Sequence, residues 1–231
     1  MPTQRPPGLF ITGTNTNVGK THVAVRMIES LVRQGVRVGV YKPAASGWRA
    51  DELEQSDPYR LWQAAGRPGT LAQVCPQTFS APLAPPAAAA AEGRKVDADL
   101  LRSGIRVWQQ NSDFVIVEGV GGLMSPVSDD DYVADLAYEF GYKLIVVAAN
   151  ELGVINQTLQ TLITAETFRE GMQVAGIVLN HPRNTNPQTD PSSLLNRADL
   201  ERRCVPPVLT ELAWNASDFS VAVDWRKTGA P

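Results

Sequence analysis

The residues with the clearest chemical potential lie near the N-terminus, in a glycine-bounded loop that ends in Gly-Lys-Thr. The loop runs from Gly13 to Thr21 and reads GTNTNVGKT. An apolar run precedes it and a helical pattern follows it, which is the layout of a phosphate-binding loop. Its glycines let backbone N–H groups turn toward a phosphate. Lys20 can then reach the β- and γ-phosphates of a nucleotide, and the Thr21 hydroxyl can hold Mg²⁺.

The loop differs from the common phosphate-binding loop in one respect. Five residues rather than four separate Gly13 from Gly19, and Thr14 stands at the usual position of the first glycine. This spacing predicts a variant subclass of P-loop proteins. The alternative interpretation is a glycine-rich turn that only caps a helix. The flanking strand and helix favour nucleotide binding.

Three further charged residues stand where they could join this loop. Lys42 follows a predicted strand, Asp57 begins a predicted short helix, and Glu118 follows an apolar strand. Ligands of parallel α/β sheets bind beyond the carboxyl ends of the strands, so these residues are candidates for phosphate and Mg²⁺ binding. Each also has a plainer interpretation: a solvated lysine at a strand end, an acid in the first turn of a helix, and a solvent-facing glutamate before a flexible turn.

Apolar runs alternate with helical patterns along most of the chain. The predicted strands cover residues 8–12, 36–41, 114–117, 144–149 and 174–179. The predicted helices cover 20–34, 57–65, a short alanine-rich stretch after residue 86, 97–110, and a segment that starts at 153. The alternation predicts an α/β fold, a single P-loop NTPase domain with a doubly wound, mostly parallel sheet flanked by helices.

We expect this one domain to occupy residues 1–231. The proline-rich start, residues 1–7, is predicted to be a loose tail. Residues 216–231 form a C-terminal extension whose role the sequence leaves open.

The composition is that of a soluble globular protein. The 231 residues are 43% hydrophobic and 19% charged, and the formal net charge is −3. There is no basic footprint of the kind that nucleic acid attracts, and no apolar run approaches the roughly 20 residues of a membrane helix. Cys75 and Cys204 lack metal-binding spacing, and the N-terminus lacks a signal-peptide core. We therefore expect a cytoplasmic protein that binds neither nucleic acid nor a membrane.

Taken together, these signatures resemble the dethiobiotin synthetase family. The matching stretches are TGTNTNVGKT at 12–21, YKPAASG at 41–47, SD at 56–57, VEGVGG at 117–122 and LGVIN at 152–156, and their order and spacing agree over about residues 8–215. The resemblance implies carboxylation and ring closure of 7,8-diaminononanoate with CO₂, which uses ATP and Mg²⁺. The implied intermediates are a carbamate and a carbamic–phosphoric anhydride, and the implied products are dethiobiotin, ADP and phosphate.

The resemblance also assigns roles by position in the motifs. The implied catalytic residues are Lys42, Lys20 and Thr16, and the implied Mg²⁺ ligands are Thr21, Asp57 and Glu118. Nucleotide binding is implied for Asn17, Val18, Gly19, Lys20, Thr21, His22, Asp57, Glu118, Gly119, Val120, Gly121, Asn180, His181, Ala213, Trp214 and Asn215. Substrate binding is implied for Thr16, Lys42, Ser46, Gly121, Gly122, Gly153, Val154 and Asn156. Asn180 would read adenine, and the helix start at 153–156 would come from the second subunit of a homodimer with sites at its interface.

The chain departs from the family pattern in three places. Asn17 stands where an acidic residue is frequent, Glu151 stands where a lysine is common, and TELA at 210–213 replaces a usual Gly-x-Ile/Leu-Pro. The last difference leaves the adenine-side loop open. None of the three alters the implied catalytic lysines or metal-binding acids. The main alternative is another ATPase or ligase of the same P-loop subclass with a different substrate.

Overall fold

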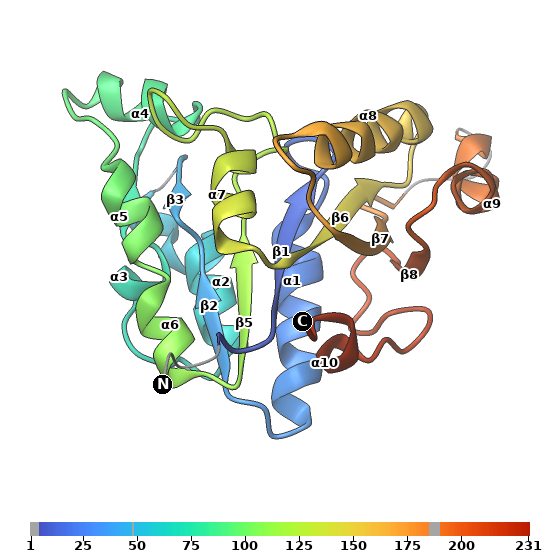
Figure 1. The fold of residues 1–231 in the computed structure, drawn as a ribbon, viewed down its shortest axis with the longest axis horizontal. Coiled ribbons are helices and arrows are strands. Elements are labelled where there is room, and N and C mark those ends of the chain that lie inside the picture. The colour runs from blue at the N-terminus through green and yellow to red at the C-terminus, as the bar shows by residue number, and fades with distance from the viewer. Residues whose placement is uncertain (1–4, 48, 185–189) are drawn as a thin grey trace.

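A six-stranded sheet forms the centre of the computed structural model, which describes residues 5–47, 49–184 and 190–231 (Figure 1). The strands are β1 Gly8–Gly13, β2 Val38–Tyr41, β5 Phe114–Glu118, β6 Lys143–Ala149, β7 Val174–Asn180 and β8 Val208–Leu212. They lie in the order β2-β5-β1-β6-β7-β8, and each neighbouring pair is parallel. Two short strands, β3 Ala44–Ala45 and β4 Gln77–Thr78, form a separate parallel pair. The predicted α/β fold is confirmed.

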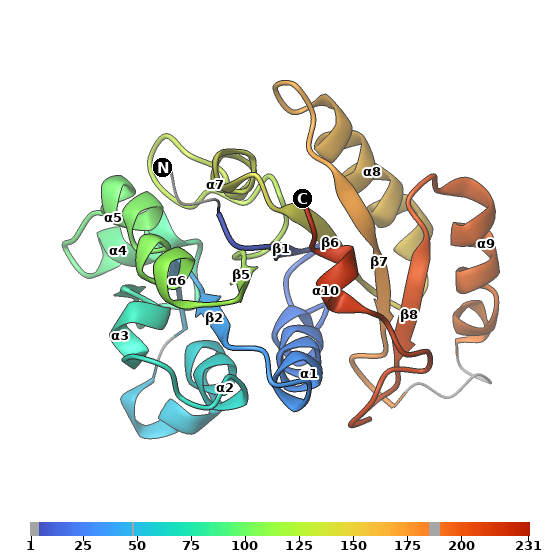
Figure 2. The same cartoon turned by 60° about the horizontal axis from the view of Figure 1, so that its bottom comes forward.

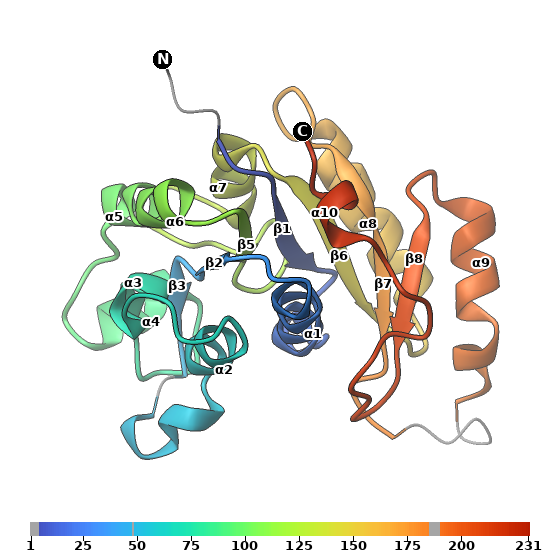
Figure 3. The ribbon, with the colours of Figure 1, turned by 90° about the horizontal axis from the view of Figure 1, so that it is seen from below.

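Helices cover both faces of the sheet. The α-helices are α1 Lys20–Arg33, α2 Asp57–Ala64, α3 Leu71–Val74, α4 Pro85–Ala91, α5 Ala98–Ser103, α6 Arg106–Asn111, α7 Val133–Phe140, α8 Val154–Thr167, α9 Asn196–Arg203 and α10 Trp225–Thr228. The 3₁₀-helices are η1 Ala50–Gln55 and η2 Pro191–Leu194. Figure 3 shows α1 and α2 on one face of the sheet and α7 and α8 on the other. The chain therefore leaves β1 and β6 toward opposite faces, which makes the sheet doubly wound.

β1 lies at the centre because its whole sequence suits burial. All six residues of GLFITG are buried, as expected for a parallel strand covered on both faces. Its neighbours are β5 and β6, and the register places Ile11 opposite Glu118. The carboxyl ends of the strands point upward in Figure 1. The phosphate-binding loop therefore leaves β1 beside the last residue of β5, at the edge where ligands of such sheets bind.

The predicted helix over residues 97–110 is wrong in one respect: it is two helices, α5 and α6, which meet at Gly104 and Ile105. The hydroxyl of Tyr41, at the end of β2, donates hydrogen bonds to the carbonyls of Leu100 and Leu101, at 3.1 and 2.8 Å. In a continuous helix the Leu101 carbonyl would accept from the N–H of Ile105. Here the Leu101 carbonyl accepts from the buried Tyr41 hydroxyl instead, and the helix is interrupted at this point.

Several elements of this structure were not predicted, among them α7, α9 and β8. β8 is the edge strand of the sheet, and its five residues alternate between buried and half-buried. Five residues of mixed polarity give too short a pattern to recognise locally. Its place in the sheet is set by pairing with β7, which the sequence alone does not reveal.

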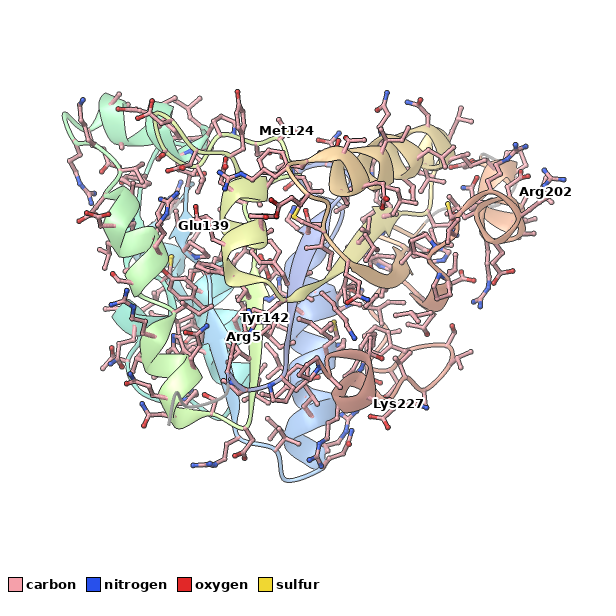
Figure 4. All side chains as sticks on the ribbon, in the orientation of Figure 1. Arg5, Met124, Glu139, Tyr142, Arg202 and Lys227 are labelled. Carbon is pink, nitrogen blue, oxygen red and sulfur yellow. The ribbon has the colours of Figure 1, made fainter. Side chains whose placement is uncertain are left out.

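Both ends of the described chain are anchored to the sheet. The guanidinium of Arg5 donates to the Gly141 carbonyl at 2.8 Å and lies over the ring of Tyr142, as Figure 4 shows. The Pro7 carbonyl accepts a hydrogen bond from the N–H of Val115 in β5 at 3.0 Å. The predicted loose tail is therefore wrong for the part of it that the structure describes, and residues 1–4 lie outside the described residues.

The C-terminal extension packs against the lower edge of the sheet. Trp225, the first residue of α10, is completely buried, and the Gly229 carbonyl accepts a hydrogen bond from the N–H of Gly8 at 3.1 Å. Figure 2 shows α10 beside α1, far from the carboxyl ends of the strands. This extension has a structural place under β1. Within the described residues, no helix has both the length and the apolar character that a membrane span requires.

Candidate active site

A cavity of about 350 Å³ opens at the carboxyl edge of the sheet, between the phosphate-binding loop and α2. Four segments that are distant in sequence form it: the loop with the start of α1, the end of β2 with the residues after it, α2, and the end of β5. The lining residues are Thr16, Asn17, Gly19, Lys20, Thr21, His22, Lys42, Ala45, Ser46, Asp57, Arg60, Glu118, Gly119, Val120 and Gly121. Most of the residues predicted for catalysis, metal binding and phosphate binding thus meet at one place.

The phosphate-binding loop is held in shape from both sides. The N–H of Thr14 donates to the carbonyl of Val147 in β6 at 3.0 Å. Gly19 precedes α1 with a φ of 93°, a left-handed conformation that disfavours other residues. A Cβ at Gly19 would also overlap the side-chain nitrogen of Asn180. The loop therefore delivers the open N–H groups of α1 to the cavity, where they can bind an anion.

Lys42 lies at the centre of the charged groups. It is only 4% exposed, and its Nζ donates to Asp57 Oδ2 at 3.0 Å and to Glu118 Oε1. The Thr21 hydroxyl donates to the same oxygen of Glu118 at 2.8 Å. Lys20 is also buried, and its Nζ donates to the carbonyl of Asn15 at 3.1 Å. Two lysines and two carboxylates thus surround the start of α1.

The two lysines respond differently to their surroundings. Burial lowers the pKa of Lys20 to about 8, although the nearby Glu118 carboxylate acts in the opposite direction. Burial alone would also lower the pKa of Lys42, but its contacts with Asp57 and Glu118 outweigh burial and raise the pKa of this lysine above its ordinary value. The Lys42 ammonium likewise holds the pKa of Asp57 below its ordinary value, against the effect of burial. Lys42 is a permanent cation, whereas Lys20 can lose its proton.

The residues predicted to bind Mg²⁺ fit that metal. Glu118 is fully buried, and its Oε2 has no hydrogen-bond partner within the described residues. A buried carboxylate oxygen without a partner is costly unless a ligand satisfies it. Mg²⁺ is commonly held by one or two carboxylates together with substrate phosphates and water. The Thr21 hydroxyl, Asp57 and Glu118 supply such a set beside the loop.

The residues predicted for adenine do not line the cavity, and one of them, Asn180, contacts the loop. The Asn180 amide nitrogen donates to the Val18 carbonyl at 2.8 Å, and its Oδ1 is buried without a partner in the described chain. The register of β7 and β8 pairs Asn180 with Leu212, so residues 213–215 begin beside it. His181 contacts Glu211 at 3.2 Å. The altered segment 210–213 thus supplies a polar partner for a predicted nucleotide-binding residue.

The remaining substrate residues lie elsewhere on the chain. Gly122 lines a second groove of about 360 Å³, between the loop after β5 and α8. Gly153 and Asn156, at the start of α8, are exposed, and Val154 is buried. None of these four residues reaches the phosphate cavity of its own chain.

Two residues that line the cavity were not predicted. Ala45 belongs to β3, and Arg60 lies one turn into α2. Arg60 follows Asp57 by three residues, and side chains at this spacing share one face of a helix. A helix that starts at Asp57 was predicted, so this spacing could have revealed Arg60.

Comparisons with known proteins agree with this arrangement. A family model described as an AAA domain matches residues 7–217. A protein of Rhodopirellula baltica named ATP-dependent dethiobiotin synthetase is 43% identical over 216 residues, which cover 88% of this chain and 82% of the relative. A protein of the same name from Anaeromyxobacter dehalogenans is 42% identical over 207 residues, which cover 90% of each chain. Among solved structures, a ParA family ATPase from Chlorobium tepidum superimposes with a TM-score of 0.55 at 13% sequence identity. The match covers 91% of this chain and 85% of the ATPase chain, which indicates a shared fold.

Proposed function

This chain belongs to the family of ATP-dependent dethiobiotin synthetases, which are ligases, and we propose that it converts 7,8-diaminononanoate, CO₂ and ATP into dethiobiotin, ADP and phosphate. The similarity to these relatives extends over about nine-tenths of the chain. The substrate and the order of steps are part of the proposal.

The proposed reaction has three steps. One amine of the diamine takes up CO₂ and loses a proton, which gives a carbamate. The γ-phosphoryl group of ATP then passes to a carbamate oxygen, ADP leaves, and a carbamic–phosphoric anhydride forms. The second amine attacks the carbamate carbon, the C–O bond to phosphate breaks, and a proton is lost from that nitrogen. The product is a five-membered cyclic urea.

The observation that carries this proposal is the pair of buried lysines beside the phosphate-binding loop. Phosphoryl transfer depends mainly on positioning and on neutralising the charge of the transferring group. Lys20 follows the loop directly, where it would reach the β- and γ-phosphates. Lys42 follows β2, on the far side of β5 from the loop, and would face the carbamate, where negative charge accumulates. Thr16 and Ser46 also line the cavity and would donate hydrogen bonds to the diamine or the carbamate.

Mg²⁺ bound here would offset the charge of the β- and γ-phosphates. The Thr21 hydroxyl, Asp57 and Glu118 would hold it, and the free Oε2 of Glu118 supports this assignment. Lys42 shares the other oxygen of Glu118. The lysine therefore keeps the two acids in position on one side of the phosphates.

We also propose where the adenine and the carboxylate tail of the diamine bind. The buried, unpartnered Oδ1 of Asn180 supports recognition of the adenine amino group by this side chain. The exposed start of α8, with Gly153 and Asn156, supports a role across a homodimer interface. There, N–H groups at the helix start would bind the tail carboxylate in the site of the partner subunit. We place this homodimer in the cytoplasm, where its substrates would be small molecules only.

The proposed function is tested with purified protein, ATP, Mg²⁺, bicarbonate and 7,8-diaminononanoate, with ADP and the cyclic urea measured by mass spectrometry. We expect equal amounts of both products. Omission of the diamine or of bicarbonate should abolish the urea, and excess EDTA should stop both products. ADP formation that is independent of the diamine, with no urea, would overturn the proposal and favour another ATPase of the same subclass.

A further inference from the structure

Arg60 brings a third positive charge to the cavity. It projects from α2, one turn after Asp57, and lines the cavity beside His22 and Thr21. Within the described residues, its guanidinium makes no hydrogen bond or ion pair, and in particular none with Asp57, although the two share a helix face. The neighbouring Asp57 carboxylate is already paired with Lys42, at 3.0 Å. Arg60 therefore lines a phosphate cavity with its donors available for another anion.

The position of Arg60 along the phosphate-binding loop indicates which phosphates it can reach. The Lys20 side chain and the metal-binding acids lie at the β- and γ-phosphate end. N–H groups further along the loop and helix start hold the α- and β-phosphates. Arg60 lines the cavity together with His22, which follows Thr21 in α1, and within the described residues it makes no hydrogen bond or ion pair with the Lys42–Glu118 pair. Its charge contributes to the lowered pKa of His22, after burial and Arg26, and it also favours the charged form of Asp57, one turn before it on α2. Arg60 therefore lies toward the α- and β-phosphate end.

From this geometry we infer that Arg60 binds the non-bridging oxygens of the α- and β-phosphates of the nucleotide. This inference deepens the proposed function, on which it rests for the identity of the nucleotide as ATP. The α- and β-phosphates are present in both ATP and ADP and gain little charge during transfer. Arg60 thus stabilises the bound nucleotide before and after the reaction to the same extent. Such uniform binding changes KM and leaves kcat unchanged.

The test compares Arg60→Ala with Arg60→Lys and with a matched control, Arg67→Ala. Arg67 follows the same helix, lies over the rings of Tyr59 and Trp62, and does not line the cavity. Its removal changes the net charge by the same amount. Thermal unfolding of each variant establishes that it is folded before the binding of Mg–ADP is measured by isothermal titration calorimetry.

We expect Arg60→Ala to weaken ADP binding about tenfold, the low end of the range for hydrogen bonds to charged groups. The KM for ATP should rise by a similar factor, while kcat and the KM for the diamine stay the same. Arg60→Lys should lose less ADP affinity than Arg60→Ala, because lysine keeps the positive charge although it lacks the forked donor geometry of arginine. Arg67→Ala should bind ADP as the unaltered protein does.

Two results would overturn the inference. The first is unchanged ADP affinity in folded Arg60→Ala. The second is a fall in kcat with ADP affinity unchanged, which would place Arg60 at the transferring phosphoryl group instead. The calorimetric measurement requires no diamine and no turnover. If ADP binding depends on Arg60 but no cyclic urea forms, the inference about Arg60 holds and the proposed substrate is wrong.

Discussion

Lys20 and Lys42 show how two buried lysines in one cavity can acquire different properties. Burial disfavours the charged form of each. Lys42 contacts two carboxylates directly, and its pKa is raised. Lys20 donates to a neutral carbonyl, and burial lowers its pKa to about 8. Lys42 is therefore suited to a constant electrostatic role, whereas the charge of Lys20 depends on pH in the range where enzymes are assayed.

Lys42→Ala should nearly abolish formation of the cyclic urea. Removal of a group that stabilises developing charge typically costs about 100-fold or more in kcat. The ADP affinity should change far less, because Lys20 and the loop remain. The measurement is the kcat for urea formation, together with calorimetric ADP binding. Lys143→Ala, which removes a half-buried lysine at the opposite end of the sheet, is the matched control. Near-normal turnover in folded Lys42→Ala would remove Lys42 from the mechanism.

The affinity for ATP should fall as the pH rises above about 8. Lys20 is protonated below its pKa of about 8 and neutral above it, and only the ammonium attracts phosphate. The pH profile of kcat/KM for ATP reports groups of the free enzyme, so it should bend downward near pH 8. In Lys20→Arg the guanidinium cannot lose its proton in this range. The kcat/KM that this variant retains should therefore not change between pH 7 and 9. A flat profile between pH 7 and 9 for the unaltered protein would contradict this assignment.

Most charged residues of the site could be predicted from the sequence, and Arg60 is the exception. Lys42 and Glu118 stand next to apolar strands whose ends must meet at one edge of a parallel sheet, so a local pattern was enough. Arg60 stands on a helix, and its place depends on how α2 packs against α1. The three-residue spacing from Asp57 indicates only that the two side chains share a helix face, whereas the packing that turns this face toward the cavity is a tertiary property.

At the scale of elements, the site depends on the close approach of the phosphate-binding loop and β7. Gly19 is the contact point, since its left-handed backbone begins α1 and its missing side chain leaves room for Asn180. Local sequence predicted β1, the loop and α1 because all three follow each other along the chain. Asn180, which is 161 residues after Gly19 in the sequence, comes close to it because of the strand order in the sheet.

Gly19→Ala should abolish nucleotide binding, lowering the ADP affinity by about 100-fold or more, equivalent to about 3 kcal/mol. The new Cβ would overlap the Asn180 side chain, in addition to the strain of a positive φ. Gly35→Ala is the matched control, because Gly35 also has a positive φ, 78°, but a Cβ there would meet no atom within 4 Å. Gly35→Ala should cost about 1–2 kcal/mol of stability and bind ADP normally. Calorimetry and thermal unfolding separate the two effects, and equal ADP affinity in both variants would refute the clash.

At the scale of the whole molecule, the unusual surface is that of α8. Leu152, before its first turn, is 82% exposed, and Ile163 is 62% exposed. Ile163 lies two turns beyond Asn156, and residues at this spacing share one face of a helix. Large exposed apolar side chains beside a proposed carboxylate site favour a protein interface. A second copy of the chain would cover them and receive the helix start in its own site.

Ile163→Asp should therefore separate the proposed homodimer into monomers, because it places a charge in the apolar part of that interface. The monomer should keep its ADP affinity, since the phosphate cavity belongs to one chain, but it should lose urea formation as the tail site becomes incomplete. Multi-angle light scattering after gel filtration gives the mass, and calorimetry gives the ADP affinity. Val205→Asp is the control, because Val205 is 98% exposed in the turn between α9 and the start of β8. A monomeric unaltered protein with full activity would show that one chain supplies the whole site.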